Sequence, residues 1–99
     1  MPKFEKVVDK QQFQPDYLFD CPGCGNSHGV WTSSPNHNGA KWNFNNDMNK
    51  PTVSPSIVVH GEKNNVICHS YISNGMIQFL VDCTHHLAGQ TVELPEINQ

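Results

Sequence analysis

Residues 66–83 have the sequence VICHSYISNGMIQFLVDC, in which Asn74 and Gly75 separate two runs rich in apolar, β-branched and aromatic side chains. An Asn-Gly pair in this position is typical of a two-residue type I′ turn between antiparallel strands. With that turn, Ser73 pairs with Met76, and the register of the whole hairpin is fixed. The sequence therefore predicts an antiparallel hairpin over these residues.

The register decides which side chains share a face of the hairpin. Cys68 and Cys83 fall on one face as diagonal neighbours, while His69 and Asp82 are diagonal neighbours on the other. A carboxylate beside a neutral histidine orients the imidazole, an arrangement found near metal ions and in catalytic sites. Each face of this hairpin is therefore a candidate functional site, one carrying two cysteines and the other a histidine beside a carboxylate.

Glycine, proline and asparagine separate short strand signals along the rest of the chain. The predicted strands cover residues 17–19, 29–32, 41–45, 56–60, 66–73, 76–81 and 91–94. Residues 29–45 predict a second hairpin carrying Trp31 and Trp42, and residues 85–89 predict one helical turn that ends with Gly89 in a left-handed conformation. We expect a mainly β fold, a small single domain of short antiparallel hairpins around a zinc-ribbon-like metal site.

The motif Cys21-Pro22-Gly23-Cys24-Gly25 is the most specific one in the sequence. Proline and glycine permit a tight turn that directs two thiolates at one ion, and a structural zinc site needs two further ligands. The predicted hairpin supplies them. The sequence therefore predicts one Zn²⁺ per chain, held by Cys21, Cys24, Cys68 and Cys83.

Three histidines and a carboxylate are alternative ligands, or neighbours of the ligands. His28 follows Cys24 by four residues, His69 is adjacent to Cys68, and His85 follows Cys83 by two residues. Asp82 enters as the partner of His69. A redox role for the Cys-x-x-Cys pair is disfavoured, because the residues after Cys24 do not resemble the start of a helix.

Length and composition narrow the class of protein. The chain has 99 residues, of which 15% are charged, a net charge of −3 and no arginine. One small domain is expected at this length, and a mean hydropathy of −0.52 makes a stabilising metal plausible. Nucleic-acid binding is disfavoured, because the six lysines are scattered and no basic face is evident.

No apolar run approaches the length of about 18 residues that a membrane span requires, and the N-terminal residues lack the apolar core of a signal peptide. We therefore expect no membrane association and a location in the cytoplasm. In that reducing compartment, four cysteines favour metal ligands over disulfides.

The blocks CPGCG at 21–25, CHS at 68–70, DCTH at 82–85 and LAGQTV at 87–92 resemble an uncharacterised protein family of tailed bacteriophages and prophages, a domain of unknown function. The resemblance covers residues 19–96, where the cysteine pattern predicts a zinc-binding β domain. Residues 1–18 fall outside it and are expected to be a variable N-terminal arm, within one domain spanning 1–99. Some members carry the label ammonia monooxygenase, which these residues do not support, because the histidines are not arranged as a copper site.

The function predicted from these observations is a phage-type accessory protein in the bacterial host cytoplasm. It would be a zinc-stabilised, non-enzymatic binding module that engages a host or phage protein, with no catalytic residue assigned. A small zinc-dependent hydrolase using His69 with Asp82 or His85 is the first alternative. A single-stranded nucleic-acid binder using Trp31, Trp42 and Phe44 is the second.

Overall fold

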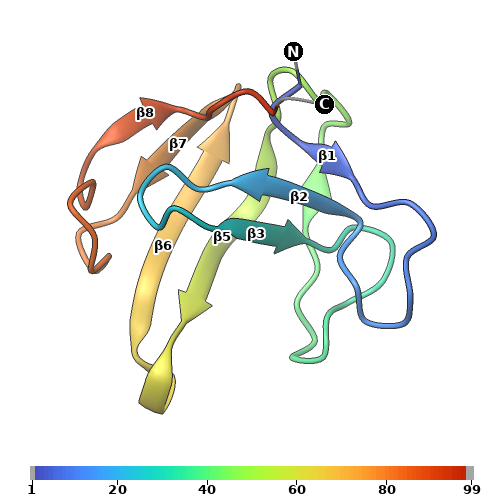
Figure 1. The fold of residues 1–99 in the computed structure, drawn as a ribbon, viewed down its shortest axis with the longest axis horizontal. Coiled ribbons are helices and arrows are strands. Elements are labelled where there is room, and N and C mark those ends of the chain that lie inside the picture. The colour runs from blue at the N-terminus through green and yellow to red at the C-terminus, as the bar shows by residue number, and fades with distance from the viewer. Residues whose placement is uncertain (1, 98–99) are drawn as a thin grey trace.

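Two antiparallel sheets make up the protein, as seen in a computed structural model that describes residues 2–97 (Figure 1). The first sheet has the order β1-β2-β3 and the second has the order β4-β5-β6-β7-β8. The strands of the first sheet are β1 (Glu5–Lys6), β2 (Tyr17–Asp20) and β3 (Ser27–Val30). The strands of the second sheet are β4 (Asn43–Phe44), β5 (Val53–His60), β6 (Val66–Ser73), β7 (Met76–Phe79) and β8 (Thr91–Glu93).

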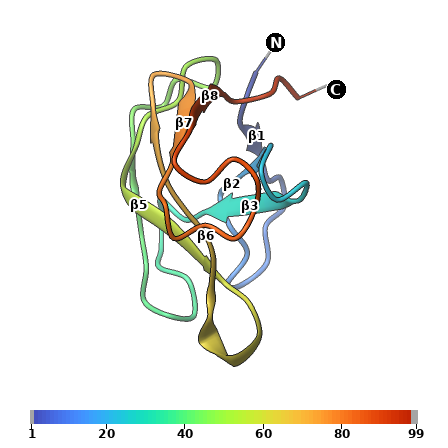
Figure 2. The same cartoon turned by 90° about the vertical axis from the view of Figure 1, so that its left-hand side faces the viewer.

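The core lies between the two sheets, which cross in Figure 1 and lie side by side in Figure 2. Phe19 and Val30 from the first sheet are fully buried with Ile77 from the second. Phe4 is also fully buried and stacks on Phe19, with ring centroids 5.5 Å apart. The N-terminal residues thus contribute directly to the core. The prediction of a mainly β, single-domain fold is confirmed.

The hairpin of β6 and β7 has the predicted register. Ser73 pairs with Met76 and Tyr71 pairs with Gln78. Asn74 and Gly75 both have positive φ angles, of 51° and 79°, as a type I′ turn requires. The local sequence was sufficient here because only a few residue types tolerate this backbone conformation.

Other local predictions were wrong. Strand β7 ends at Phe79 rather than at residue 81, because the chain turns there and the Cys83 N–H donates to the Leu80 carbonyl. The predicted hairpin over 29–45 does not form: β3 pairs with β2, and β4 pairs with β5. Its two halves belong to different sheets, although the Trp42 N–H still donates to the Trp31 carbonyl.

Residues 85–89 form hydrogen-bonded turns instead of a helical turn, with Gly89 at a φ of 79° as predicted. Within residues 2–97, the one helical segment is a short 3₁₀ helix, η1 (Glu62–Asn64), between β5 and β6. None of the described residues forms a helix long and apolar enough to cross a membrane.

Candidate active site and metal centre

Three side chains form a continuous hydrogen-bonded series on the outer face of the second sheet. The Nδ1 atom of His69 lies 3.1 Å from Oδ2 of Asp82, and Nε2 of the same ring lies 3.0 Å from Oγ of Ser56. The side chain of His69 is 24% exposed and that of Asp82 is 47% exposed, while Ser56 is half-buried. The series is therefore open to a substrate from solvent.

The two partners of the His69 ring, the Asp82 carboxylate and the Ser56 hydroxyl, determine which ring nitrogen donates a hydrogen bond and which accepts one. An ionised carboxylate only accepts hydrogen bonds, so the proton of a neutral His69 ring lies on Nδ1, facing Asp82. Nε2 then carries the free lone pair and accepts from the Ser56 hydroxyl. This is the arrangement in which an imidazole removes a proton from a nucleophilic serine.

Each member of the series comes from a different element. His69 lies on β6, and Asp82 lies in the turn that follows β7. Ser56 lies on β5 where the pairing with β6 shifts register, between the Val53–Ile72 pair and the Ile57–Ser70 pair. Such irregularities redirect side chains and are common beside active sites. The predicted contact of His69 with Asp82 is present, although Asp82 reaches it from a turn.

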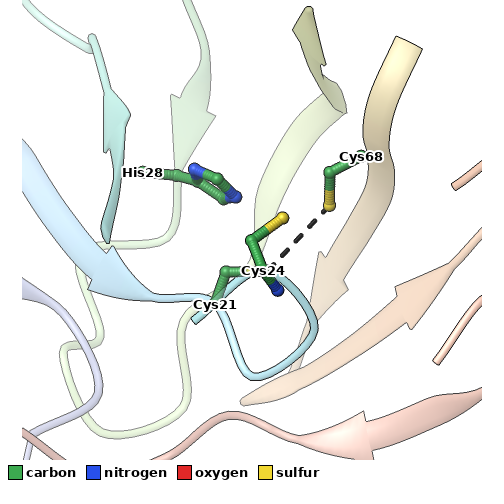
Figure 3. Close-up of side chains that lie close together, drawn as sticks. All are labelled: Cys21, Cys24, His28 and Cys68. Atoms are coloured by element: carbon green, nitrogen blue, oxygen red, sulfur yellow. Dashed lines mark hydrogen bonds between the residues drawn. The ribbon is translucent and has the colours of Figure 1, made fainter. Parts of the chain in front are cut away.

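A second cluster of polar side chains lies inside the molecule, between the two sheets. One ligand atom from each of Cys21, Cys24, His28 and Cys68 lies within 4.8 Å of the others, and Figure 3 shows these side chains converging from the first sheet and from β6. The Sγ atoms of Cys21 and Cys68 are 3.9 Å apart, and the Cys24 N–H donates to Sγ of Cys21 at 3.4 Å. These residues could hold a metal ion.

Crowding of the thiols changes their acidity. A hydrogen bond from the Cys68 thiol lowers the pKa of Cys21 to about 3, against the opposing effect of burial. Burial raises the pKa of Cys24 to about 11, and the hydrogen bond to Cys21 raises the pKa of Cys68 far above its usual range. One thiolate is thus stabilised by neighbouring groups that stay protonated, as expected where several cysteines share one site.

Cys83 belongs to an adjacent group of three possible ligands, with Cys68 and His85. Its Sγ atom accepts from the His69 N–H and donates to the His69 carbonyl, both at 3.2 Å. The imidazole of His85 lies directly over Gly23, where a Cβ atom would come within 2.5 Å of three ring atoms. Of the four predicted cysteine ligands, three converge with His28, and the fourth converges with Cys68.

Sequence reasoning named Cys21, Cys24 and Cys68 as ligands and His28 as an alternative one, and it named two members of the hydrogen-bonded series, but it missed Ser56. No local motif marks this serine, and neither the Ser-His-Asp order nor the spacing of 13 residues on each side of His69 is a known signature. Ser56 becomes recognisable only when the pairing of β5 with β6 sets Val58 opposite His69 and so brings the Ser56 side chain, two residues from Val58, within reach of the ring. That pairing was not predicted.

A serine, a histidine and a carboxylate linked in this way define the type of site that serine hydrolases use. The comparisons with known proteins agree with this class. The chain belongs to the family described as "Bacterial ubiquitination-like system serine protease (BubE)", whose model matches residues 2–80. The match includes Ser56 and His69. Searches of curated proteins and of solved structures found no significant match.

The family match corrects the function predicted from the sequence. A phage-type, non-enzymatic accessory module is wrong, because the family is one of serine proteases and its match gives no link to bacteriophages. Of the expectations drawn from the resemblance to a phage protein family, only membership in a small domain family is supported. The error came from treating His69 and Asp82 as neighbours of a metal, when they face away from the thiols and toward Ser56.

Proposed function

We propose that this protein is a serine peptidase in which Ser56 is the nucleophile, His69 the general base and Asp82 the residue that orients the base. The hydrogen-bonded series from Ser56 through His69 to Asp82 is the observation that carries this proposal. The membership of the chain in a serine protease family supports it independently.

The reaction follows from the positions of the protons. Oγ of Ser56 forms a bond to the carbonyl carbon of the substrate while Nε2 of His69 takes the hydroxyl proton. His69 then gives that proton to the departing amine as the peptide bond breaks, which leaves an acyl group on Ser56. A water molecule, deprotonated by His69 in turn, releases the acid product and restores the serine. Asp82 stabilises the imidazolium throughout both steps.

The description of the family places its proteases in a bacterial ubiquitination-like system. We propose accordingly that the substrate is a protein component of such a system, and that the enzyme works in the bacterial cytoplasm. Four free cysteines suit that reducing compartment.

Covalent labelling of the serine tests the catalytic assignment. A fluorophosphonate probe should react with the wild-type protein, because Oγ of Ser56 displaces fluoride from phosphorus, and peptide mapping should place the adduct on Ser56. Ser56→Ala should abolish labelling. Ser54→Ala, which alters an exposed serine on the same strand, should retain it. Labelling that persists in Ser56→Ala would overturn the proposal.

We further propose that the cluster of Cys21, Cys24, His28 and Cys68 binds one Zn²⁺ per chain. Three thiols and one imidazole are a ligand set typical of structural zinc. The donors also fit the ion, because Nε2 of His28 is buried without a hydrogen-bond partner among the described residues. A bound cation would supply that partner and compensate the mutual repulsion of the thiolates.

The set of four cysteines predicted from the sequence differs only in its last member, with Cys83 in place of His28. Metal analysis of two variants distinguishes the sets. We expect one zinc per chain in the wild type and in Cys83→Ser, and loss of tight binding in His28→Ala. The opposite pattern would assign the last ligand to Cys83, and the absence of zinc from the wild-type protein would refute the metal site.

A further inference from the structure

The free edge of strand β5 runs past the nucleophile and carries unpaired backbone groups. Strand β4 pairs only with Val53 and Ser54, so among residues 2–97 the rest of β5, from Pro55 to His60, has no neighbouring strand on that side. On its other side, β5 pairs with β6. An open edge of this kind is a template for another extended chain.

The register shows which residue presents its backbone to this edge. The His69 carbonyl accepts from the Leu80 N–H on the side of β7, so the residues on either side of His69 direct their backbone groups to β5 instead. Their partners on β5 are Ile57 and Val59. Val58, between those two, therefore directs its N–H and C=O to the free edge.

Two observations agree with this orientation. The Ser56 carbonyl, two residues from Val58 and on the same edge, accepts a hydrogen bond from Nε1 of Trp42 at 3.2 Å. The backbone groups of Val58 have no such partner among residues 2–97. The Trp42 side chain therefore occupies the hydrogen-bonding position at Ser56, whereas the backbone groups of Val58 are available to another chain.

The space beside this edge is large enough for a peptide. A cavity of about 400 Å³ lies between the loop that contains Asn36 and Trp42 and the strand that contains Ser56, Val58 and His60. Ser56 and Val58 thus line the same cavity. A chain paired with Val58 lies two residues along β5 from Ser56, and the indole of Trp42 occupies the edge at that point.

We infer that the enzyme binds its substrate as an extended polypeptide segment that pairs with Val58 and becomes an additional strand beside β5. The inference rests on the proposed peptidase function and deepens it by naming the substrate class. Such a segment must be free to extend, so it is a flexible tail or linker rather than the surface of a folded domain. One residue of the segment exchanges two hydrogen bonds with Val58, and the scissile carbonyl lies near Ser56.

Peptide-extended inhibitors test this inference. Mixed-sequence acetyl-tetrapeptidyl diphenyl phosphonates and acetyl-aminoalkyl diphenyl phosphonates without the peptide both phosphonylate serine nucleophiles with loss of phenol. We expect the peptide to accelerate labelling of wild-type Ser56 at least about tenfold, since two hydrogen bonds together contribute about that much. Val58→Pro removes the N–H and should lose the acceleration, measured as the ratio of the peptidyl-probe rate to the short-probe rate in the same variant. Val58→Thr keeps the N–H and should retain the acceleration.

A second measurement uses the wild-type protein alone, in case Val58→Pro fails to fold. Methylation of the peptide nitrogen that faces Val58 should remove the acceleration, whereas methylation of either adjacent nitrogen should not. Equal rates with the peptidyl and short probes, or acceleration that is indifferent to methylation, would overturn the inference. If Ser56 is not a catalytic nucleophile at all, neither probe labels it, and this result distinguishes an error in the proposed function from an error in the proposed binding mode.

Discussion

At the scale of single residues, the proposed catalysis depends on the proton that the His69 ring holds at Nδ1. Asp82 keeps it there, because a carboxylate 3.1 Å away accepts this proton and has none to donate. The opposite nitrogen is then free to act on Ser56. The carboxylate therefore determines the tautomer as well as the position of the ring.

Replacement of Asp82 by asparagine should leave the side-chain shape unchanged and reverse this preference. The amide group can donate to Nδ1, which moves the ring proton to Nε2 and blocks acceptance from Ser56. We expect the rate of p-nitrophenyl acetate hydrolysis to fall by up to about 10⁴-fold. The melting temperature should change little, because the Asp82 side chain is half-exposed.

Asp20→Asn is the matched control, since Asp20 is an exposed carboxylate on β2 of the first sheet that accepts a hydrogen bond from Ser27. It should hydrolyse the ester at the wild-type rate. Equal rates in Asp82→Asn and the wild type would remove Asp82 from the mechanism.

At the scale of elements, strands and turns that neighbouring residues specify were predictable, whereas pairings between separate segments of the chain were not. The hairpin of β6 and β7 was predictable with its register, because Asn74 and Gly75 specify the turn locally. The Cys21–Cys24 turn was recognisable for the same reason. The partner of β4 was not, because it depends on contacts between separate segments of the chain. Ser56 was missed for that reason too.

Asp16, just before β2, shows how one carboxylate fixes a loop. Its Oδ2 accepts from the backbone N–H groups of Thr32 and Ser33 at 2.7 and 3.0 Å, and its Oδ1 accepts from Nζ of Lys10 at 3.2 Å. Burial alone would raise the pKa of Asp16, but these hydrogen bonds outweigh it and hold the pKa well below its usual range. The ionised form therefore stabilises the fold.

The pH dependence of the stabilisation by Asp16 follows from the direction in which its pKa is shifted. Because the folded pKa is lowered, the stabilisation is complete above the unfolded pKa of 3.8 and is lost as the pH falls below it. Asp16→Asn should lower the free energy of unfolding by about 1–3 kcal/mol at pH 7. Urea denaturation of both proteins should show this difference shrinking below about pH 4. A difference that is the same at pH 7 and pH 3 would exclude this role for Asp16.

At the scale of the whole molecule, the candidate metal ligands and the proposed catalytic series lie on opposite faces of the same strand. Cys68 points into the core toward the first sheet, and His69, the next residue, points outward to Ser56. Cys83 follows Asp82 in the same way, and its Sγ atom contacts the backbone of His69. An ion bound by the cluster would join the first sheet to the strand that carries the general base.

Removal of zinc should therefore weaken the whole fold. Structural zinc contributes an apparent stabilisation of about 10–16 kcal/mol, comparable with the total stability of a small domain. We expect a strong chelator to lower the melting temperature by more than about 10 °C and to abolish fluorophosphonate labelling of Ser56, and added Zn²⁺ to restore both. Cys24→Ser should behave as the chelated protein does even with zinc present. An unchanged melting curve in chelator would show that the two sheets hold the catalytic residues in place without a metal.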